Sequence, residues 1–262
     1  MNNQPKISII TVSYNSAETI KDSIESVLAQ NYSNIEYIII DAGSKDNTID
    51  IVDSYHDKIN YFISERDEGI YDGMNKGISA ATGDFIGILN SDDFYPSNDI
   101  VSKVAKTIIK YKCDSVYGDL IYVRSNKIKK VVRYWQSGEF SISKLKKGWM
   151  LPHPTFFVRR KLYKKYGMYN TDLKSAADYE MILRLLYKHN ISVRYIPEIL
   201  VNMRQGGKSN SSLLNRLKAN HEDSIAWKIN DLAQPYFIRL KKPIIKIRQF
   251  FVRPKSNIIS IK

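Results

Sequence analysis

Residues 35–41, Ile-Glu-Tyr-Ile-Ile-Ile-Asp, form a nearly continuous apolar run that ends in an aspartate. Such runs are typical of strands that helices cover on both faces, as in a parallel sheet. Similar runs alternate along the chain with stretches in which apolar residues follow helical spacing. We expect strands at 6–13, 59–64 and 84–89, and helices at 16–30, 47–55, 70–81 and 99–111. The alternation predicts an α/β fold with a doubly wound, mostly parallel sheet.

After residue 118 the pattern changes to a smaller antiparallel region. Residues 121–124 and 128–134 predict a strand pair. The remaining expectations are strands at 155–158 and 192–196, helices at 159–166, 177–189 and 213–232, and a loop at 202–212. The chain therefore divides into 1–118, 119–212 and 213–262, and the last part is a helix followed by a basic tail.

The composition indicates a folded protein outside the membrane interior. The chain has 262 residues, 43% of them hydrophobic and 26% charged, which suits one large domain and excludes a disordered chain. Its single cysteine, Cys113, excludes an intramolecular disulfide and fits a reducing compartment such as the cytoplasm. No uncharged apolar run reaches the roughly 18 residues that span a bilayer, so we expect a soluble or peripheral protein.

The C-terminal tail concentrates positive charge. Residues 236–262 carry eight basic and no acidic side chains and supply +8 of the net charge of +13, with Phe237, Phe250 and Phe251 interleaved. Three explanations stay open: the tail packs on the main domain, it binds an anionic membrane surface, or it binds nucleic acid. Acidic clusters elsewhere in the chain would repel phosphates, which makes nucleic acid the least favoured partner.

Polar side chains follow four of the predicted strands. These strand ends are Thr11 with Ser13-Tyr14-Asn15, Asp41 to Ser44, Ser64 to Asp67, and Asn90 to Asp93. In an open α/β sheet, ligands bind beyond the carboxyl ends of the strands. Four such ends on one edge predict a binding site there, although each end alone also suits helix capping.

Asp92 and Asp93 favour a divalent cation at this edge. The chain has neither Gly-x-Gly-x-x-Gly after the first strand nor Gly-x-x-x-x-Gly-Lys-Ser/Thr, which disfavours dinucleotide oxidoreductases and excludes P-loop enzymes. Two adjacent carboxylates can hold Mg²⁺ or Mn²⁺, and the metal then neutralises a bound diphosphate. The alternative is a solvated turn before the helix at 99–111.

Four ordered motifs carry a resemblance to a known family. They are Ser13-Tyr14-Asn15, Ile39-Ile-Asp41-Ala-Gly-Ser-Lys-Asp46, Asp67-Glu-Gly69-Ile-Tyr-Asp72-Gly-Met-Asn75-Lys-Gly77, and Gly83 to Asp93. Over residues 6–209 the chain resembles family 2 glycosyltransferases, most closely those that build bacterial surface polysaccharides. The resemblance implies a GT-A fold and inverting sugar transfer from a nucleotide-sugar, usually a UDP-hexose or UDP-N-acetylhexosamine. It also implies that 1–118 binds the donor and 119–212 the acceptor.

The resemblance implies roles for individual residues at the sheet edge. The expected nucleotide contacts are Thr11, Ser13, Tyr14, Asn15 and Asp41, the last of which binds the uracil edge. Asp93 is expected to bind Mn²⁺ or Mg²⁺, and Asp92 the ribose or the same metal. Many relatives carry Arg-Asn in the helix after the third strand, where this chain has Met74-Asn75. Asp72 and Lys76 are therefore expected to replace that contact.

Inverting transfer needs a carboxylate that takes a proton from the acceptor hydroxyl. Asp178, in Ala176-Ala-Asp-Tyr-Glu180 at the start of a predicted helix, falls where the family's catalytic aspartate lies. Glu180 is the alternative base, about 200° away around the helix. A helix-capping role for Asp178 also stays open.

Three further side chains are candidates for the site. His153, between two prolines, is expected to be a third metal ligand or an acceptor contact, and a packed histidine is the alternative. Arg204 and Lys208, in the Gly-containing stretch 203–209, are expected to close over the diphosphate. A basic surface loop is the alternative for both.

Together these features predict a non-processive transferase that uses Mn²⁺ or Mg²⁺. It would add one sugar to a polyprenyl-diphosphate-linked oligosaccharide in O-antigen, capsule or exopolysaccharide synthesis. The basic tail, with Lys127, Lys129, Lys130 and Arg133, would hold it at the inner face of the cytoplasmic membrane. The Gln-x-x-Arg-Trp motif of processive relatives is absent. The rivals are a sugar-phosphate nucleotidyltransferase, whose glycine-rich loop is missing here, and a basic nucleic-acid-binding module.

Overall fold

The computed structural model describes residues 4–124, 127–205, 213–235 and 249–252 of the chain. Lys208 and most of the basic tail lie outside these residues, and so do the side chains of Lys127 and Lys129. The predicted contacts of these residues with phosphate and with a membrane therefore stay predictions.

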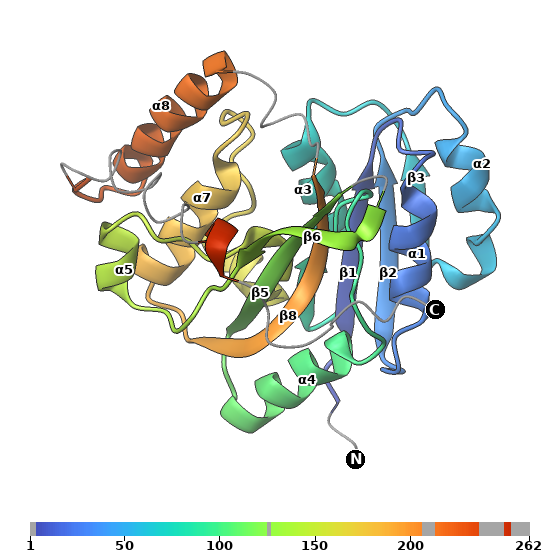
Figure 1. Ribbon diagram of the computed structural model, residues 1–262, viewed down its shortest axis with the longest axis horizontal. Helices are drawn as coiled ribbons and strands as arrows, with labels where there is room; N and C mark the ends of the chain where they lie inside the picture. Colours follow the sequence, from blue (N-terminus) through green and yellow to red (C-terminus); the bar gives the residue numbers. More distant parts are fainter. Residues whose placement is uncertain (1–3, 125–126, 206–212, 236–248, 253–262) are drawn as a thin grey trace.

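A single eight-stranded sheet runs through the molecule (Figure 1). Its strands are β1 (Ile7–Ser13), β2 (Ile35–Asp41), β3 (Tyr61–Ser64), β4 (Phe85–Ile88), β5 (Ser115–Arg124), β6 (Lys127–Trp135), β7 (Phe157–Arg159) and β8 (Val193–Gln205). Their order is β3-β2-β1-β4-β7-β5-β6, and β8 pairs with β5. The pairs among β1 to β4 are parallel, whereas β6 and β7 run antiparallel to β5. The predicted mostly parallel sheet with a smaller antiparallel region is confirmed.

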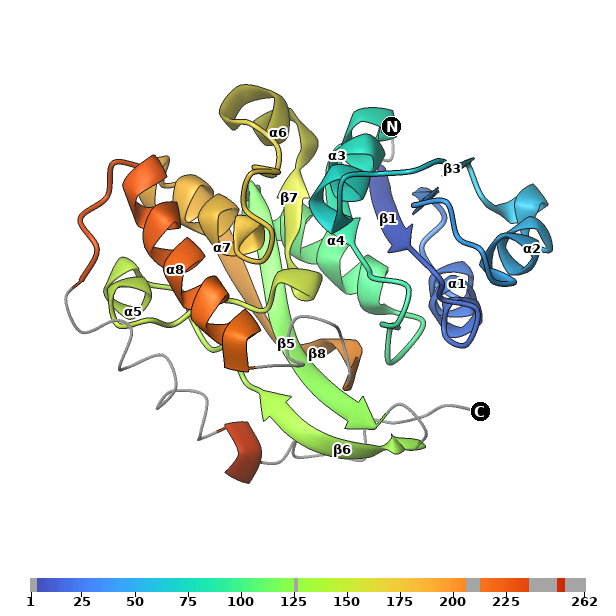
Figure 2. The same cartoon turned by 90° about the horizontal axis from the view of Figure 1, so that it is seen from above.

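Helices cover both faces of this sheet (Figures 1 and 2). They are α1 (Ile20–Leu28), α2 (Thr48–Asp53), α3 (Ile70–Ala80), α4 (Ile100–Tyr111), α5 (Ile142–Lys146), α6 (Arg160–Tyr166), α7 (Ala177–Ile182) and α8 (Leu213–Ile229). Short helical turns are η1 (His56–Lys58) and η2 (His153–Thr155), and the π-helical segment η3 (Leu183–Lys188) continues α7.

The side chains of β1 separate two hydrophobic cores. Ile10 and Val12 belong to a cluster of buried residues that includes side chains of α3, α6 and α7. Ile7 and Ile9 belong to a second cluster, with side chains of α1 and α4. Successive side chains of a strand point to opposite faces. A strand such as β1, in which all seven residues are buried, therefore lies between two helix layers.

The first four residues of the loop expected at 202–212 belong to a strand instead, and residues 206–212 lie outside the described part of the chain. Residues 202–205 belong to β8 and pair with the end of β5, at 121–124. The backbone of Asn202 also exchanges two hydrogen bonds with Phe94, at 2.9 and 3.0 Å. These partners satisfy the backbone of a polar stretch that local composition alone favours as loop. β5 itself runs unbroken from 115 to 124, so the expected division at residue 118 falls inside one shared strand.

Helix α8 packs against α7 in the C-terminal half. Trp227 is 1% exposed, and its indole N–H donates to the hydroxyl of Tyr179 at 2.9 Å. This contact anchors the predicted C-terminal helix to the rest of the domain. Within the described parts of the chain, no helix combines the length and apolar character needed to cross a bilayer.

Candidate active site

The carboxyl ends of β1, β2 and β3 meet at Asp41. Its side chain is fully buried and accepts hydrogen bonds from the hydroxyls of Ser13 (2.8 Å), Ser44 (2.6 Å) and Ser64 (2.7 Å). The backbone N–H of Ser44 adds a fourth, at 2.8 Å. A buried carboxylate needs such partners because its desolvation is otherwise costly. Asp41 thus links the ends of the three strands through hydrogen bonds. One of the serine hydroxyls must rotate away before the carboxylate can accept a hydrogen bond from a nucleobase.

The turn after β4 joins the same edge through Ser91. Its hydroxyl shares a 2.8 Å hydrogen bond with the hydroxyl of Ser16, and its N–H donates to the carbonyl of Val12 at 3.3 Å. Asn15, in a left-handed conformation with a φ of 48°, accepts the N–H of Lys45 at 2.9 Å. The four polar strand ends therefore converge at one edge of the sheet, where Tyr14 and Asn15 are exposed.

Asp92 and Asp93 at this turn differ in burial. Asp93 is fully buried, and its burial and the neighbouring charge of Asp92 raise its pKa well above the usual value. Asp92 is partly exposed, and burial raises its pKa while the charge of Arg204 opposes the shift. The raised pKa values indicate that too little positive charge lies nearby to stabilise the ionised forms of Asp92 and Asp93.

Unpaired polar atoms gather around this pair. Among the described residues, the buried side-chain atoms that lack a hydrogen-bond partner are Asn90 Oδ1, Asp93 Oδ1 and both polar atoms of Asn202. An unpaired buried group costs about 1–3 kcal/mol, so these oxygens suit a bound cation or water. Proteins commonly hold Mg²⁺ through one or two carboxylates together with substrate phosphates. Asp92 and Asp93 therefore fit Mn²⁺ or Mg²⁺, which when bound would neutralise a diphosphate.

Arg204 lies in β8, which corrects its expected role as a loop residue that closes over the diphosphate. Its side chain is 5% exposed, pairs with Asp22 of α1 and donates to the carbonyl of Asp92 at 2.9 Å. Its guanidinium also lies over the ring of Phe94, 4.9 Å from the centroid. These contacts keep Arg204 buried against the Asp92–Asp93 turn rather than in a surface loop.

Thr11 and His153 also lie elsewhere than expected. Thr11 is fully buried, and its hydroxyl is 3.1 Å from that of Tyr37, inside the core that α1 and α4 cover. His153 is 8% exposed, with Nε2 2.5 Å from the hydroxyl of Tyr169, and burial lowers its pKa. In the part of the chain that the structure describes, no three His, Cys, Asp or Glu side chains group as metal ligands. His153 is therefore a packed histidine rather than a third ligand beside the aspartates.

Asp72 and Lys76 form a charged rim on α3. Lys76 pairs with Glu65 at 2.8 Å and with Asp72 at 3.6 Å, and the hydrogen bond from Lys76 to Glu65 raises the pKa of the lysine. All three line a groove of about 700 Å³, together with Tyr61 and Met168. Both predicted residues are partly exposed, so a ligand can reach them.

Asp178 faces the N-terminal half of the molecule. The hydroxyl of Tyr71, in α3, donates to Asp178 Oδ1 at 3.2 Å. The ring of Tyr71 stacks on Tyr169, with centroids 5.6 Å apart and planes 21° apart. Asp178 lies in the first turn of α7, which Ala176 precedes as the cap residue, so it is not the helix cap. Its side chain is partly exposed and can meet an acceptor hydroxyl.

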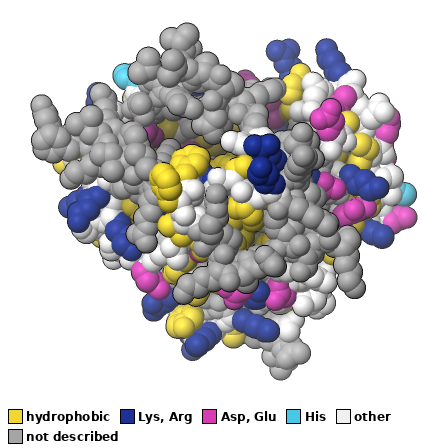
Figure 3. All heavy atoms as spheres, in the orientation of Figure 1, with side chains coloured by type: hydrophobic (Ala, Val, Ile, Leu, Met, Phe, Trp, Pro, Cys, Tyr) yellow, Lys and Arg dark blue, Asp and Glu magenta, His cyan; other side chains and the backbone are white. Residues whose placement is uncertain are grey.

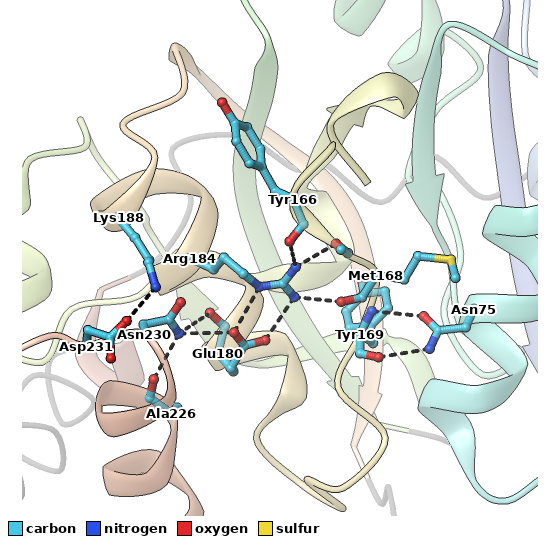
Figure 4. A network of polar contacts seen from close by, with 11 residues as sticks. Asn75, Tyr166, Met168, Tyr169, Glu180, Arg184, Lys188, Ala226, Asn230 and Asp231 are labelled. Atoms are coloured by element: carbon cyan, nitrogen blue, oxygen red, sulfur yellow. Dashed lines mark hydrogen bonds and ion pairs between the residues drawn. The ribbon is translucent and has the colours of Figure 1, made fainter. Parts of the chain in front are cut away.

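Glu180, the alternative base, is enclosed in a structural network (Figure 4). It is 1% exposed and pairs with Arg184 through two contacts of 2.9 Å, and Asn230, the residue after α8, donates to it at 3.0 Å. Arg184 also donates to the carbonyl of Met168 at 2.6 Å. A paired and enclosed carboxylate cannot reach a substrate proton, so Asp178 is the better candidate.

The sequence assigns no role to Tyr71, Tyr169 or Asn202, which the structure brings to the site. Tyr71 lies within the motif at 67–77, and its place in that motif is the sequence feature that could have marked it as a site residue. Tyr169 and Asn202 follow no local pattern, because their partners Asn75 and Phe94 lie far away in the chain.

The fold and the site together define a sugar transferase of the GT-A type. The chain belongs to glycosyl transferase family 2, because the model of that family matches residues 8–167. It is 29% identical over 212 residues to a PGL/p-HBAD biosynthesis glycosyltransferase of Mycobacterium bovis BCG, covering 79% of this chain and 80% of the relative. An uncharacterized glycosyltransferase of Rickettsia typhi is 33% identical over 227 residues, covering 82% and 69%. The resemblance seen in the motifs is thus confirmed.

Solved structures share the fold. Staphylococcus aureus TarS 1-349, in complex with UDP-GlcNAc, superposes with a TM-score of 0.65 at 18% identity and covers 94% of this chain and 78% of TarS. The mannosyltransferase PcManGT of Pyrobaculum calidifontis, in complex with GDP-Man and Mn²⁺, has a TM-score of 0.65 at 16% identity, covering 95% and 70%. At these identities the likeness supports the GT-A fold alone.

Proposed function

We propose that this enzyme transfers one sugar, with inversion, from a UDP-hexose or UDP-N-acetylhexosamine to a hydroxyl of a polyprenyl-diphosphate-linked oligosaccharide. The product would enter surface polysaccharide synthesis, as in O-antigen, capsule or exopolysaccharide. The observation that carries the proposal is the 3.2 Å contact between Asp178 and Tyr71, which puts a partly exposed carboxylate at the junction of the two halves. The UDP-GlcNAc bound by TarS and the GDP-Man and Mn²⁺ bound by PcManGT support a nucleotide-sugar donor and a metal.

In the proposed reaction Asp178 takes the proton of the acceptor hydroxyl. The hydroxyl oxygen then attacks the anomeric carbon, and the bond between that carbon and the diphosphate breaks, so its electron pair leaves with the diphosphate. Ser13, Tyr14, Asn15 and Asp41 would hold the nucleoside, and Asp72 and Lys76 its outer side. Asp92 and Asp93 would hold the cation that offsets the charge of the departing group.

Hydrolysis of a panel of nucleotide-sugars in the presence of Mn²⁺ tests this proposal. We expect slow release of UDP from one UDP-sugar and little from GDP-mannose, because water replaces a missing acceptor. Asp93→Asn should lose the Mn²⁺-dependent part of UDP binding, measured by calorimetry. Asp57→Asn, at an 84% exposed carboxylate, is the matched control. Mn²⁺-dependent UDP binding by Asp93→Asn at wild-type strength would overturn the assigned metal site.

We also propose that the enzyme sits on an anionic membrane at its cytoplasmic face. Phe250 and Phe251 belong to the basic tail and are 51% and 80% exposed, and the guanidinium of Arg133 lies 5.4 Å from the ring centroid of Phe250. On the face drawn in Figure 3, acidic side chains lie on the side of α1 and α2, with basic side chains among them, and along the lower edge near α4. Exposed aromatic and basic groups together suit a lipid headgroup surface.

Sedimentation with vesicles that contain an anionic lipid tests the membrane contact. The full chain with Phe250→Ser and Phe251→Ser should sediment several-fold less than the wild type, because it loses its apolar anchors. Tyr111→Ser, at a 47% exposed aromatic of α4, is the matched control. Equal sedimentation of the Phe250/Phe251 variant and the wild type would remove this role.

A further inference from the structure

We propose that Tyr71 is a positioning residue for the catalytic carboxylate of Asp178. The inference rests on the proposed function, in which Asp178 is the base. Tyr71 belongs to α3, the helix that also carries Asp72 and Lys76 on the proposed donor side. One segment of the chain would therefore bind the donor and orient the base that serves the acceptor.

The hydrogen bond between the two residues fixes one oxygen of the carboxylate. Tyr71 donates to Oδ1 at 3.2 Å, which assigns Oδ2 to the proton of the acceptor hydroxyl. Burial and the nearby charge of Asp178 raise the pKa of Tyr71, so its hydroxyl keeps its proton and donates. A donor of this kind restricts the rotation of the carboxylate, and catalysis depends strongly on such orientation.

The ring of Tyr71 is itself held in place. It stacks on Tyr169, whose backbone N–H and carbonyl make two hydrogen bonds of 2.9 Å with the side chain of Asn75, also in α3. The hydroxyl of Tyr169 contacts His153, which packs against the Tyr169 ring at 81°. Tyr169 is thus held by Asn75 through its backbone and by His153 through its hydroxyl, and its ring supports the ring of Tyr71. His153 therefore has a structural role in fixing Tyr169.

The support of Tyr169 also continues into the C-terminal half. Arg184 donates to the carbonyl of Met168, the residue before Tyr169, and pairs with Glu180 two residues after Asp178 (Figure 4). The guanidinium of Arg184 therefore contacts the segment next to Tyr169 and the helix that carries Asp178. This shared support lets a single hydroxyl set the direction of the carboxylate.

The test is Tyr71→Phe, which keeps the stacked ring and removes the hydroxyl. We expect kcat to fall about tenfold, because one hydrogen bond to a charged group is lost, while KM for the donor and UDP affinity stay unchanged. A structural role alone would lower stability or raise KM as well. Tyr111→Phe, at a distant exposed tyrosine of α4, is the matched control and should keep wild-type kcat.

A double-variant cycle separates this inference from the proposed function. If Tyr71 acts through Asp178, Tyr71→Phe should cost nothing further in an Asp178→Asn background. Wild-type kcat for Tyr71→Phe, or an unchanged tenfold loss in that background, would overturn the inference while Asp178 remains the base. Full turnover by Asp178→Asn alone would instead overturn the proposed base and the inference with it.

Discussion

The acidic sheet edge of the N-terminal half and the Glu180 site of the C-terminal half treat buried negative charge in opposite ways. At the N-terminal sheet edge, Asp41 is met by neutral hydroxyls, and the pKa of Asp93 is raised because burial and Asp92 leave its charge uncompensated. In the C-terminal half, Glu180 is paired with the Arg184 guanidinium and is fully enclosed. This contrast supports our proposal that the acidic sheet edge receives a cation and a diphosphate, whereas the enclosed Glu180 supports the fold.

The largest effect is expected at Asp178, the one acidic group of the C-terminal half that we assign to chemistry. Asp178→Asn should lower kcat about 10³-fold, since general base catalysis contributes roughly 10²–10⁴. UDP binding should be unchanged, because the donor edge lies in the other half. Single-turnover transfer and UDP calorimetry measure the two quantities, and Asp172→Asn, at an exposed carboxylate, is the control. Activity near wild type would mean that another group is the base.

The next largest effect, on the free energy of unfolding, is expected for substitution of Arg184, which pairs with the enclosed carboxylate of Glu180. Arg184→Met should lower the free energy of unfolding by about 3–5 kcal/mol, because Glu180 then stays buried without its partner. Urea denaturation measures the loss. The double variant Arg184→Met/Glu180→Gln should recover part of it, since no buried charge remains. A loss of less than about 1 kcal/mol in the single variant would show that Arg184 is not needed to offset Glu180.

A smaller effect on the free energy of unfolding is expected for substitution of Glu36, a carboxylate of the N-terminal half that, like Glu180, is buried and pairs with a basic side chain. Burial pushes the pKa of Glu36 up, but hydrogen bonds from Lys6, Ser8 and Thr82 outweigh it and lower the pKa to about 2. Glu36→Gln should therefore cost about 1–3 kcal/mol of unfolding free energy at pH 7.

The pH dependence sharpens this prediction. Because the folded pKa of Glu36 is below the usual 4.5, its ionised form stabilises the fold above about pH 4.5, and that contribution fades as the pH falls toward 2. The difference in unfolding free energy between the wild type and Glu36→Gln should shrink over this interval. Urea titrations at pH 7, 4 and 3 measure it, and a difference that is constant with pH would contradict the assignment.

The smallest effect is expected at Lys76, on the rim of α3. Lys76→Met should raise KM for the donor roughly threefold and leave kcat unchanged, because exposed ion pairs contribute about 0.2–1 kcal/mol. Lys58→Met, in the exposed turn η1, controls for the loss of one surface charge. An unchanged donor KM would remove Lys76 from the donor site.

Much of the N-terminal half could be predicted from local patterns. The apolar runs, the polar strand ends and the Asp92–Asp93 pair lie within short stretches, and a parallel sheet necessarily brings such ends to one edge. In the C-terminal half, the extent of β8 depends on β5 and Phe94, and the place of Arg204 depends on Asp22 and Asp92, all distant in sequence. The place of His153 depends on Tyr169, 16 residues further along the chain. No local pattern carries that information.

The amino-acid order alone determined the α/β architecture, the family and the acidic sheet edge, because periodicity and motif spacing act over a few residues at a time. The packing of distant segments was needed to learn that Asp178 is partly exposed while Glu180 is enclosed, that Arg204 is buried, and that Tyr71 meets the proposed base. The contacts of Asp178 with Tyr71 and of Arg204 with Asp92 join segments 107 and 112 residues apart in sequence. The free energy of a charged group depends on such neighbours more than on its own position in the chain.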